Sequence, residues 1–164
     1  MTVLEMGKNA KHAAMALGRL STEEKNNILK KCAQALLDNC EEILDANKVD
    51  VDEAIKKGIS GALIDRLTLN VQRVKGMADG LVDVASLDDP VGGVTEMVKR
   101  PNGLLIGKKA VPLGVVGIIF EARPNVTADA FGLCLKSGNA AFLRGGKEAV
   151  NSNIAIESIF RAVL

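Results

Sequence analysis

Two short polar segments contain the side chains best suited to chemistry. They are Glu121 to Asn125 and Arg144 to Glu148, and each directly follows a short apolar run. An amide such as that of Asn125 can donate to a tetrahedral oxyanion without adding charge. The forked guanidinium of Arg123 suits a carboxylate or a phosphate, with a salt bridge to Glu121 as the structural alternative. These residue types predict a site for an oxyanion or another anionic group.

A strand–helix–strand unit is expected to position both segments. Val115 to Phe120 is apolar and interrupted only by Gly117, which predicts a parallel strand buried on both faces. A helix follows up to Lys136, where Gly138 suits the left-handed position that closes a helix. Ala140 to Leu143 is a second apolar strand. Because such units bind ligands outside the carboxyl ends of their strands, we expect both polar segments to lie at a ligand site.

The order of residues in this unit also resembles a known group of enzymes. We find a resemblance to the aldehyde dehydrogenase superfamily in VPLGVVGII, an Asn-containing loop, a helix ending Gly-Asn and a strand ending in a basic residue. The chain is similar to the γ-glutamyl phosphate reductase branch in FEARPNV and LCLKSGNAAFLRGGKEA. The same branch is resembled by LSTEEKNNILKKCAQALLDNCEEILDANKVDVDEA and LIDRLTLN in the amino-terminal half. The resemblance therefore runs over essentially the whole chain.

The resemblance implies both a fold and an activity. The fold is α/β and aldehyde dehydrogenase-like, with amino-terminal helices, the first βαβ of a parallel nucleotide-binding sheet and a β-hairpin arm. The activity is NADPH-dependent reduction of γ-glutamyl 5-phosphate to glutamate 5-semialdehyde with release of phosphate, a cytoplasmic step of proline biosynthesis. The implied partners are γ-glutamyl phosphate as substrate, glutamate 5-kinase, and further copies of the chain bound through the hairpin.

The resemblance also implies roles for individual residues. Asn125 matches the Asn that aldehyde dehydrogenases use for the oxyanion, although Ala122 to Asn125 replaces their Trp-Asn-Phe-Pro and a helix N-cap is the alternative. Arg144 falls where the family bonds the adenosine ribose, and Lys147 falls where an acidic residue favours the unphosphorylated cofactor. Lys147 is therefore expected to answer the 2′-phosphate of NADPH, with a solvated surface Lys as the alternative.

We assign Asn125 to catalysis, no residue to a metal, and a larger set to cofactor binding: Glu121, Arg123, Arg144, Gly145, Gly146 and Lys147. Arg123 can serve either the substrate or the cofactor pyrophosphate. The two glycines let the backbone approach a ligand closely, although two glycines alone are more often a turn. The chain has no G-x-G-x-x-G, a motif that the superfamily also does without.

The three Cys residues favour structural roles. Cys32 and Cys40 are eight residues apart in one helical pattern, about 12 Å from each other, which is too far for a disulfide. Cys134 lies between Leu133 and Leu135 near a helix end, with no cation specified to lower its pKa. In the family the nucleophilic Cys lies in the carboxyl-terminal part of the chain, so we expect it to be absent here.

The amino-terminal half predicts helices. One amphipathic helix begins near Val3, and Ser21 with Glu24 forms a capping box for a second helix with Ile28, Cys32, Leu36 and Cys40 inside. A short helix is expected over Asp50 to Lys57, and another after Asn70, before Asp88-Asp89-Pro90. A final helical pattern covers Asn151 to Leu164.

The chain changes character at Val94. Val94 to Arg100 and Leu104 to Val111 are strand-like around Pro101-Asn102-Gly103, which predicts a β-hairpin. By resemblance the hairpin is an oligomerisation arm, and packing on its own domain is the alternative. The expected division is 1–93 for the helical part of the cofactor-binding domain, 94–111 for the arm and 112–164 for the first βαβ of the NADP-binding domain.

Bulk composition excludes several classes of protein. The net charge of +1 and the aromatic content of 2% disfavour nucleic-acid binding. No apolar run approaches the roughly 20 residues of a bilayer helix. Only two parallel strands appear, so we expect an amino-terminal fragment or a truncated product without the catalytic domain. The alternatives are a nonenzymatic structural or regulatory product and another aldehyde or acyl-CoA dehydrogenase.

Overall fold

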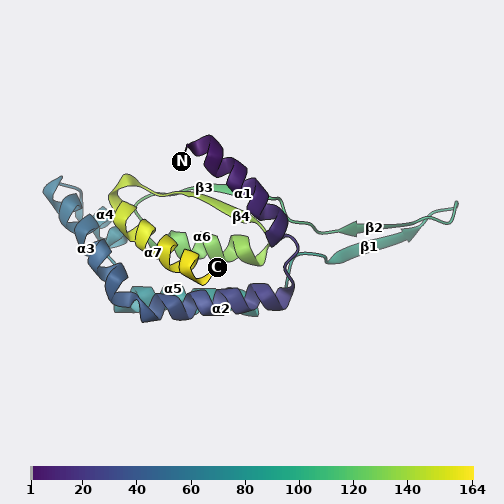
Figure 1. Ribbon diagram of the computed structural model, residues 1–164, viewed down its shortest axis with the longest axis horizontal. Coiled ribbons are helices and arrows are strands. Elements are labelled where there is room, and N and C mark those ends of the chain that lie inside the picture. Colours follow the sequence, from purple (N-terminus) through teal and green to yellow (C-terminus); the bar gives the residue numbers. More distant parts are fainter. Residues whose placement is uncertain (1) are drawn as a thin grey trace.

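The computed structural model describes residues 2–164, which contain seven α-helices, four strands and one 3₁₀ turn (Figure 1). The elements, in chain order, are α1 (Val3–Leu17), α2 (Thr22–Asp38), α3 (Cys40–Lys56), α4 (Gly61–Leu67), α5 (Val71–Ser86), β1 (Val94–Lys99), β2 (Leu105–Lys109), β3 (Val115–Ile119), α6 (Asn125–Lys136), β4 (Ala140–Arg144), the 3₁₀ turn η1 (Lys147–Ala149) and α7 (Val150–Val163).

The βαβ unit predicted from the sequence is present. β3 and β4 pair in parallel, with Val115 opposite Ala140 and Ile119 opposite Arg144, and α6 is the crossover between them. The Phe120 N–H continues the ladder by donating to the Arg144 carbonyl at 3.1 Å. Gly138 has φ of +71° at the end of α6, as its position in the sequence predicted. Both polar segments therefore leave the same edge of the strand pair.

The prediction that β3 is buried on both faces is wrong for this chain. Exposed and half-buried residues alternate along β3, and the side chain of Ile119 is 76% exposed. Figure 1 shows α6 below the two strands and α1 above them. α1 contacts β3 and β4, yet it contains no buried residue, so this face is covered thinly. An unbroken apolar run reports only that a strand can be buried, not how much protein covers it.

The main core lies between α2, α5, α6 and α7. Its fully buried members include Leu29, Leu36, Val74 and Ile156, and the rings of Phe131 and Phe160 stack beside them with centroids 4.6 Å apart. Residues that precede the hairpin in the sequence and residues that follow it therefore form one core. Residues 2–93 and 112–164 pack against each other as a single body, with 94–111 outside it.

Two of the predicted helix starts are capped as expected. The Ser21 hydroxyl accepts from the Glu24 N–H at 3.2 Å, and the Glu24 carboxylate accepts from the Ser21 N–H at 2.7 Å. The Asn70 side chain accepts from the Arg73 N–H at 2.8 Å and opens α5. Each bond satisfies a backbone donor that has no partner within its helix.

The interpretation of residues 40–57 is corrected by the structure. Cys40 does not extend the inner stripe of the second helix, because α2 stops at Asp38 and Asn39 leaves helical geometry with φ of −109° and ψ of 26°. A single helix, α3, then covers Cys40 to Lys56 in place of the short helix expected from Asp50. At the break, the side-chain amide and the backbone N–H of Asn39 both donate to the Ala35 carbonyl, at 2.8 and 3.1 Å. α4 was not predicted.

Buried polar contacts fix α3 against the start of α7. One Asp50 carboxylate oxygen accepts from the Asn151 N–H at 3.2 Å, and the other accepts from the Ser152 N–H at 2.8 Å. The Asn47 side chain binds the Leu67 carbonyl and the Leu69 N–H at 2.8 and 2.7 Å. The end of α4 and the loop after β4 are thereby held in place.

A second buried polar cluster joins the helices at the base of the hairpin. The buried Lys25 ammonium lies 2.5 Å from the Asp89 carboxylate and donates to the Lys136 carbonyl at 3.2 Å. Lys136 is also buried, and its ammonium donates to the Asn26 side chain and the Ala85 carbonyl at 2.7 and 3.0 Å. Asp89 in turn accepts from the Val91 N–H at 2.9 Å, just before the hairpin.

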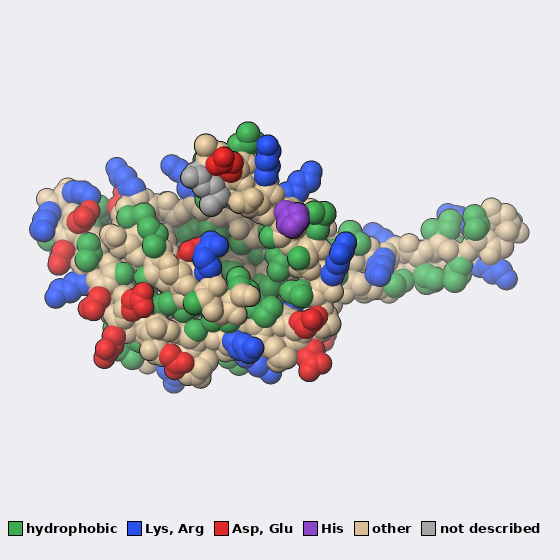
Figure 2. All heavy atoms as spheres, in the orientation of Figure 1, with side chains coloured by type: hydrophobic (Ala, Val, Ile, Leu, Met, Phe, Trp, Pro, Cys, Tyr) green, Lys and Arg blue, Asp and Glu red, His purple; other side chains and the backbone are tan. Residues whose placement is uncertain are grey.

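The predicted hairpin is confirmed, and it extends away from the body (Figures 1 and 2). β1 and β2 are antiparallel, with Met97 opposite Gly107, and every residue of both strands is exposed. A Cβ on Gly107 would lie 2.3 Å from the Met97 sulfur and 3.3 Å from the Glu96 carbonyl, which explains the glycine. The hairpin contributes nothing to the core of the body.

Candidate functional site

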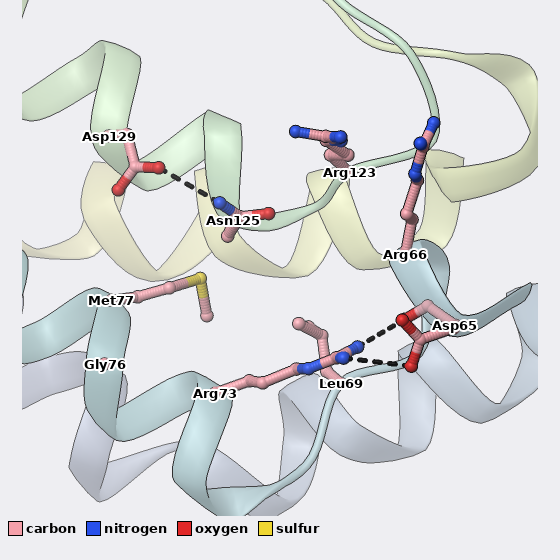
Figure 3. Close-up of a pocket in the computed structure, with 9 residues that line it drawn as sticks. All are labelled: Asp65, Arg66, Leu69, Arg73, Gly76, Met77, Arg123, Asn125 and Asp129. Carbon is pink, nitrogen blue, oxygen red and sulfur yellow. Dashed lines mark hydrogen bonds and ion pairs between the residues drawn. The ribbon is translucent and has the colours of Figure 1, made fainter. Parts of the chain in front are cut away.

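A cavity of about 450 Å³ opens where the loop after β3 meets α4 and α5 (Figure 3). Its walls are mostly charged or polar, and the residues that line it are Asp65, Arg66, Leu69, Arg73, Gly76, Met77, Arg123, Asn125 and Asp129. Arg123 and Asn125 were predicted as site residues from the sequence, and the structure brings both to this one cavity. The αβ segment therefore meets the helical amino-terminal half here.

Asn125 is the first residue of α6 and borders the cavity. Its side-chain amide donates to the Asp129 carboxylate, one turn along the helix, at 3.1 Å. The alternative that Asn125 is a helix N-cap is wrong, because Pro124 occupies the cap position without a side-chain cap bond. The amide has two hydrogens and Asp129 takes one, so the other remains for a group in the cavity.

Arg123 enters the cavity from the loop, and the expected alternative of a salt bridge to Glu121 is wrong. Glu121 lies 4.0 Å from Arg66 instead, and both side chains are largely exposed, so that ion pair is weak. Within residues 2–164 the Arg123 guanidinium has no hydrogen-bond or ion-pair partner, although its backbone N–H donates to the Glu121 carbonyl at 2.8 Å. Its five side-chain donors are available to a ligand.

Asp129 was missed by the sequence interpretation. Burial raises the pKa of its carboxyl above the ordinary value, and the hydrogen bond from Asn125 opposes that rise only in part. The available signal was its position four residues after Asn125, which puts both side chains on one helix face. A carboxylate without a cationic partner in the part of the chain that is described, facing a cavity, is a binding candidate.

The floor of the cavity was also missed, because it comes from α4 and α5. The Arg73 guanidinium binds the Asp65 carboxylate at 3.1 Å and the Thr68 carbonyl at 2.5 Å. Arg73 thus fastens the end of α4 to the start of α5. It is a fixed structural group, in contrast to Arg123.

The second predicted segment lies beside a different cavity. This cavity has about 480 Å³ and is lined by Phe120, Glu121, Ala122, Gly146 and Glu148 together with Ile59, Leu63 and Leu67. Glu121 and Gly146 of the predicted set line it. Arg144 and Lys147 are exposed and do not line it, and Lys147 opens the turn η1 rather than a regular α-helix. The loop after β3 separates the two cavities, so one short segment borders both.

Gly145 and Gly146 have a packing role in the structure. A Cβ on Gly145 would lie 2.2 Å from the Asn153 side-chain nitrogen, and one on Gly146 would lie 3.1 Å from the Ala122 nitrogen. The glycines therefore let the loop after β4 sit against α7 and against the loop after β3. Close approach to protein explains both residues without a ligand.

Two of the three Cys residues, Cys32 and Cys134, are in surroundings that disfavour a thiolate. Burial raises the pKa of the Cys32 thiol to about 11, and it also raises the pKa of the Cys134 thiol. Both thiols are therefore protonated at neutral pH and are poor nucleophiles. Cys40 is half-buried at the start of α3.

Residues 2–164 contain neither a membrane-spanning helix nor a cluster of metal-ligating side chains. No helix there is both long enough and apolar enough to cross a membrane. No group of three or more His, Cys, Asp or Glu side chains is arranged to hold a metal ion in the described part of the chain.

Comparison with known proteins tests the family resemblance that was found in the sequence. No family model matches the chain. A γ-glutamyl phosphate reductase from Clostridium perfringens is 58% identical over 158 residues, which is 96% of this chain and 38% of that protein. The structure of a γ-glutamyl phosphate reductase from Thermotoga maritima superposes with a TM-score of 0.96 at 45% identity, over 98% of this chain and 39% of that one. The chain is homologous to the amino-terminal portion of γ-glutamyl phosphate reductase.

A more distant match supports the fold alone. A probable aldehyde dehydrogenase from Listeria monocytogenes superposes with a TM-score of 0.69 at 17% identity, over 95% of this chain and 32% of that one. The α/β, aldehyde dehydrogenase-like fold expected from the sequence is confirmed. The chain spans about two fifths of the length of the γ-glutamyl phosphate reductases that it matches.

Proposed function

We propose that this chain forms the amino-terminal part of a cytoplasmic NADPH-dependent γ-glutamyl phosphate reductase. The reaction converts γ-glutamyl 5-phosphate to glutamate 5-semialdehyde, releases phosphate and serves proline biosynthesis. The observation that carries the proposal is the 58% identity to a γ-glutamyl phosphate reductase over 158 residues. Another aldehyde dehydrogenase is disfavoured, because the likeness to such an enzyme falls to 17% identity.

Within this reaction the chain supplies binding and charge stabilisation. Asn125 donates its second amide hydrogen to the oxyanion that develops when the acyl carbon is attacked. Asp129 holds the first amide hydrogen and so fixes the orientation of the amide. By resemblance to the family, the nucleophile is a Cys in the carboxyl-terminal part of the enzyme, and the buried, protonated thiols of Cys32 and Cys134 are poor substitutes for it.

The residues after β4 suit a phosphorylated dinucleotide. The bound cofactor supplies the hydride. Arg144 and Lys147 are exposed cations close in sequence to Gly146, which lines the cavity, and neither cation has an ion-pair partner among the residues described. In this proposal, Arg144 binds the adenosine ribose and the Lys147 ammonium binds its 2′-phosphate. Glu121 borders the same cavity, and Arg123 serves the neighbouring one.

Two assays test the proposal. The 164-residue chain alone and a full-length protein that carries it are compared for phosphate-dependent oxidation of glutamate 5-semialdehyde with NADP⁺. Turnover by the full-length protein only, within about 1 to 1000 per second, is expected. Turnover by the chain alone that is lost in Cys134→Ser would contradict the assignment of the nucleophile to a Cys outside these 164 residues.

Cofactor choice is tested at Lys147. A charge-assisted bond contributes about 1.5 to 3 kcal/mol, so Lys147→Ala should lower the preference for NADPH over NADH roughly ten- to a hundredfold. Lys147→Glu should lower it further. Lys56→Ala, which removes an exposed Lys from α3, is the matched control. An unchanged ratio in both Lys147 variants would leave Arg144 as the candidate reader of the phosphate.

A further inference from the structure

The cavity beside Asn125 contains two opposite charges that do not neutralise each other. The Asp129 carboxylate accepts one hydrogen bond from the Asn125 amide, and within residues 2–164 it has no Lys or Arg partner. The Arg123 guanidinium lines the same cavity, also without a partner in the described part of the chain. Figure 3 shows Asp129 and Asn125 on α6, with Arg123 and Arg66 on the opposite side.

Two other arginines line the cavity. Arg73 is bound to Asp65 and to the Thr68 carbonyl, whereas Arg66 makes only a weak, exposed ion pair with Glu121 at 4.0 Å. Partial burial disfavours the charged form of Asp129 and raises its pKa, a cost that a bound cation would offset. Among residues 2–164, the charged groups of this cavity without any ion pair are thus one anion, Asp129, and one cation, Arg123, with the neutral amide of Asn125 beside them.

The spacing fits a short amino acid chain. The Asn125 amide nitrogen lies 3.1 Å from one Asp129 carboxylate oxygen, and the second Asp129 oxygen takes no part in that hydrogen bond. In a γ-glutamyl group the side-chain carbonyl carbon and the α-nitrogen are four bonds apart, or about 5 Å when extended. A carbonyl oxygen at the Asn125 amide therefore brings the α-ammonium within reach of Asp129.

We propose that this cavity recognises the amino acid end of the substrate, with Asp129 binding the α-ammonium group and Arg123 binding the α-carboxylate. The assignment rests on the proposed function, because it takes the reacting carbonyl to lie at Asn125. It makes Asp129 and Arg123 determinants of substrate specificity. An aldehyde without an amino acid end then loses both contacts while keeping the contact with Asn125.

Three aldehydes separate the two contacts in a full-length protein that carries this chain. Glutamate 5-semialdehyde has both groups, 5-oxopentanoate lacks the amine, and 4-aminobutanal lacks the carboxylate. Phosphate-dependent oxidation with NADP⁺ gives kcat/KM for each. The variants are Asp129→Asn and Arg123→Gln, and Asp83→Asn, an exposed Asp on α5 outside the cavity, is the control.

The expected pattern is a crossover. Asp129→Asn should lower kcat/KM for the two amines, mainly through KM, by roughly 10- to 100-fold more than for 5-oxopentanoate, whose own decrease reports only the lost orientation of Asn125. Arg123→Gln should lower it by a similar factor for the two carboxylates and leave 4-aminobutanal unchanged. Because each result is a ratio between substrates on one sample, a smaller folded fraction does not alter it.

Two other outcomes overturn the assignment in distinguishable ways. If Asp129→Asn lowers kcat/KM equally for all three aldehydes, Asp129 acts only by orienting Asn125 and the cavity does not read the amino acid end. If the unmodified full-length protein does not oxidise glutamate 5-semialdehyde at all, the proposed function and the assignment fail together.

Discussion

At the scale of single residues, Asn125 is the group whose loss should affect the chemistry most. Its amide is bonded to Asp129 on one side and borders the cavity on the other. The sequence suggested either an oxyanion donor or a helix cap, and the structure leaves no cap bond to lose. An oxyanion donor and a helix cap therefore predict different effects of Asn125→Ala, because only the loss of a cap would lower stability.

Asn125→Ala in the full-length protein should lower kcat by roughly 100- to 1000-fold, the usual cost of removing one oxyanion donor. KM for the aldehyde and the melting temperature should change little, because no cap is lost. Steady-state kinetics and a thermal melt check both statements. The control is Asn39→Ala, which removes a side-chain bond to the Ala35 carbonyl outside the cavity lining and should lower stability without lowering kcat. A fall in melting temperature with unchanged kcat for Asn125→Ala would restore the capping interpretation.

At the scale of elements, α5 contains a glycine at a position where helix propensity disfavours it. Gly76 is in the interior of α5, where glycine is destabilising by about 1 kcal/mol relative to Ala, and it lines the cavity. A Cβ there would meet no atom within 4 Å. The protein therefore keeps a small residue at a position that packing leaves free.

Gly76→Ala should raise the free energy of unfolding by up to about 1 kcal/mol and raise KM for glutamate 5-semialdehyde, because the new methyl group enters the cavity. Gly7→Ala in α1 is the matched control, since a Cβ there also meets nothing within 4 Å but lies outside this cavity. It should gain stability without a change in KM. An unchanged KM in Gly76→Ala would show that the substrate does not approach α5.

The junction between α2, α5 and α6 gives the protein a stability that depends on pH. Partial burial of Asp89 opposes its ionisation, but the bonds from Lys25, Thr22 and Val91 outweigh it and lower the pKa of that carboxyl. A lowered folded-state pKa contributes stability that is complete above the ordinary value near 3.9 and is lost as the pH falls through the lowered value.

Asp89→Asn should therefore lower the melting temperature at pH 7, where about 1 to 3 kcal/mol is expected from leaving the buried Lys25 without its carboxylate. The difference from the unmodified protein should shrink below pH 4. Thermal melts at pH 7 and pH 3 measure it, with Asp88→Asn, an exposed neighbour, as the control. A difference that is constant with pH would mean that the ionised form of Asp89 is not what stabilises the junction.

At the scale of the whole molecule, the hairpin and the outer face of β3 remain without a cover in this chain. Val98 and Ile106 face each other across β1 and β2, and Ile106 is 50% exposed. An isolated two-stranded ribbon is marginally stable in water, and exposed strand edges favour pairing with another chain. These features support the proposal that the hairpin joins copies of the protein.

Ile106→Glu should shift the full-length protein to a smaller assembly, because a charge replaces an apolar contact at the proposed interface. Lys108→Glu, on the same exposed strand, is the control and should have the smaller effect. Light scattering after size-exclusion chromatography gives the mass of each. An unchanged mass in Ile106→Glu would favour packing of the hairpin on its own subunit.

The sequence by itself determined the elements whose signals are local. Ser21 with Glu24, Asn70, Gly138 and the Pro101-Asn102-Gly103 turn specify caps and turns through bonds and backbone angles within a few residues. The parallel pairing of β3 and β4 followed from the βαβ pattern, because two strands joined by one helix have few other arrangements. Family resemblance added the activity, the cofactor and the candidate roles of Asn125 and Lys147.

Only the tertiary structure decided which distant residues share a cavity and which faces stay uncovered. Asp65, Arg73 and Gly76 meet Asn125 and Asp129 because α4 and α5 pack beside the loop after β3, a contact that spans about 50 residues of chain and leaves no local pattern. The break between α2 and α3 lies at Asn39 inside an otherwise helical stretch, and the exposure of β3 depends on how thinly α1 covers it. The periodicity of apolar residues indicates which side chains can be buried. The packing of whole elements determines which side chains are buried and which remain available to a ligand.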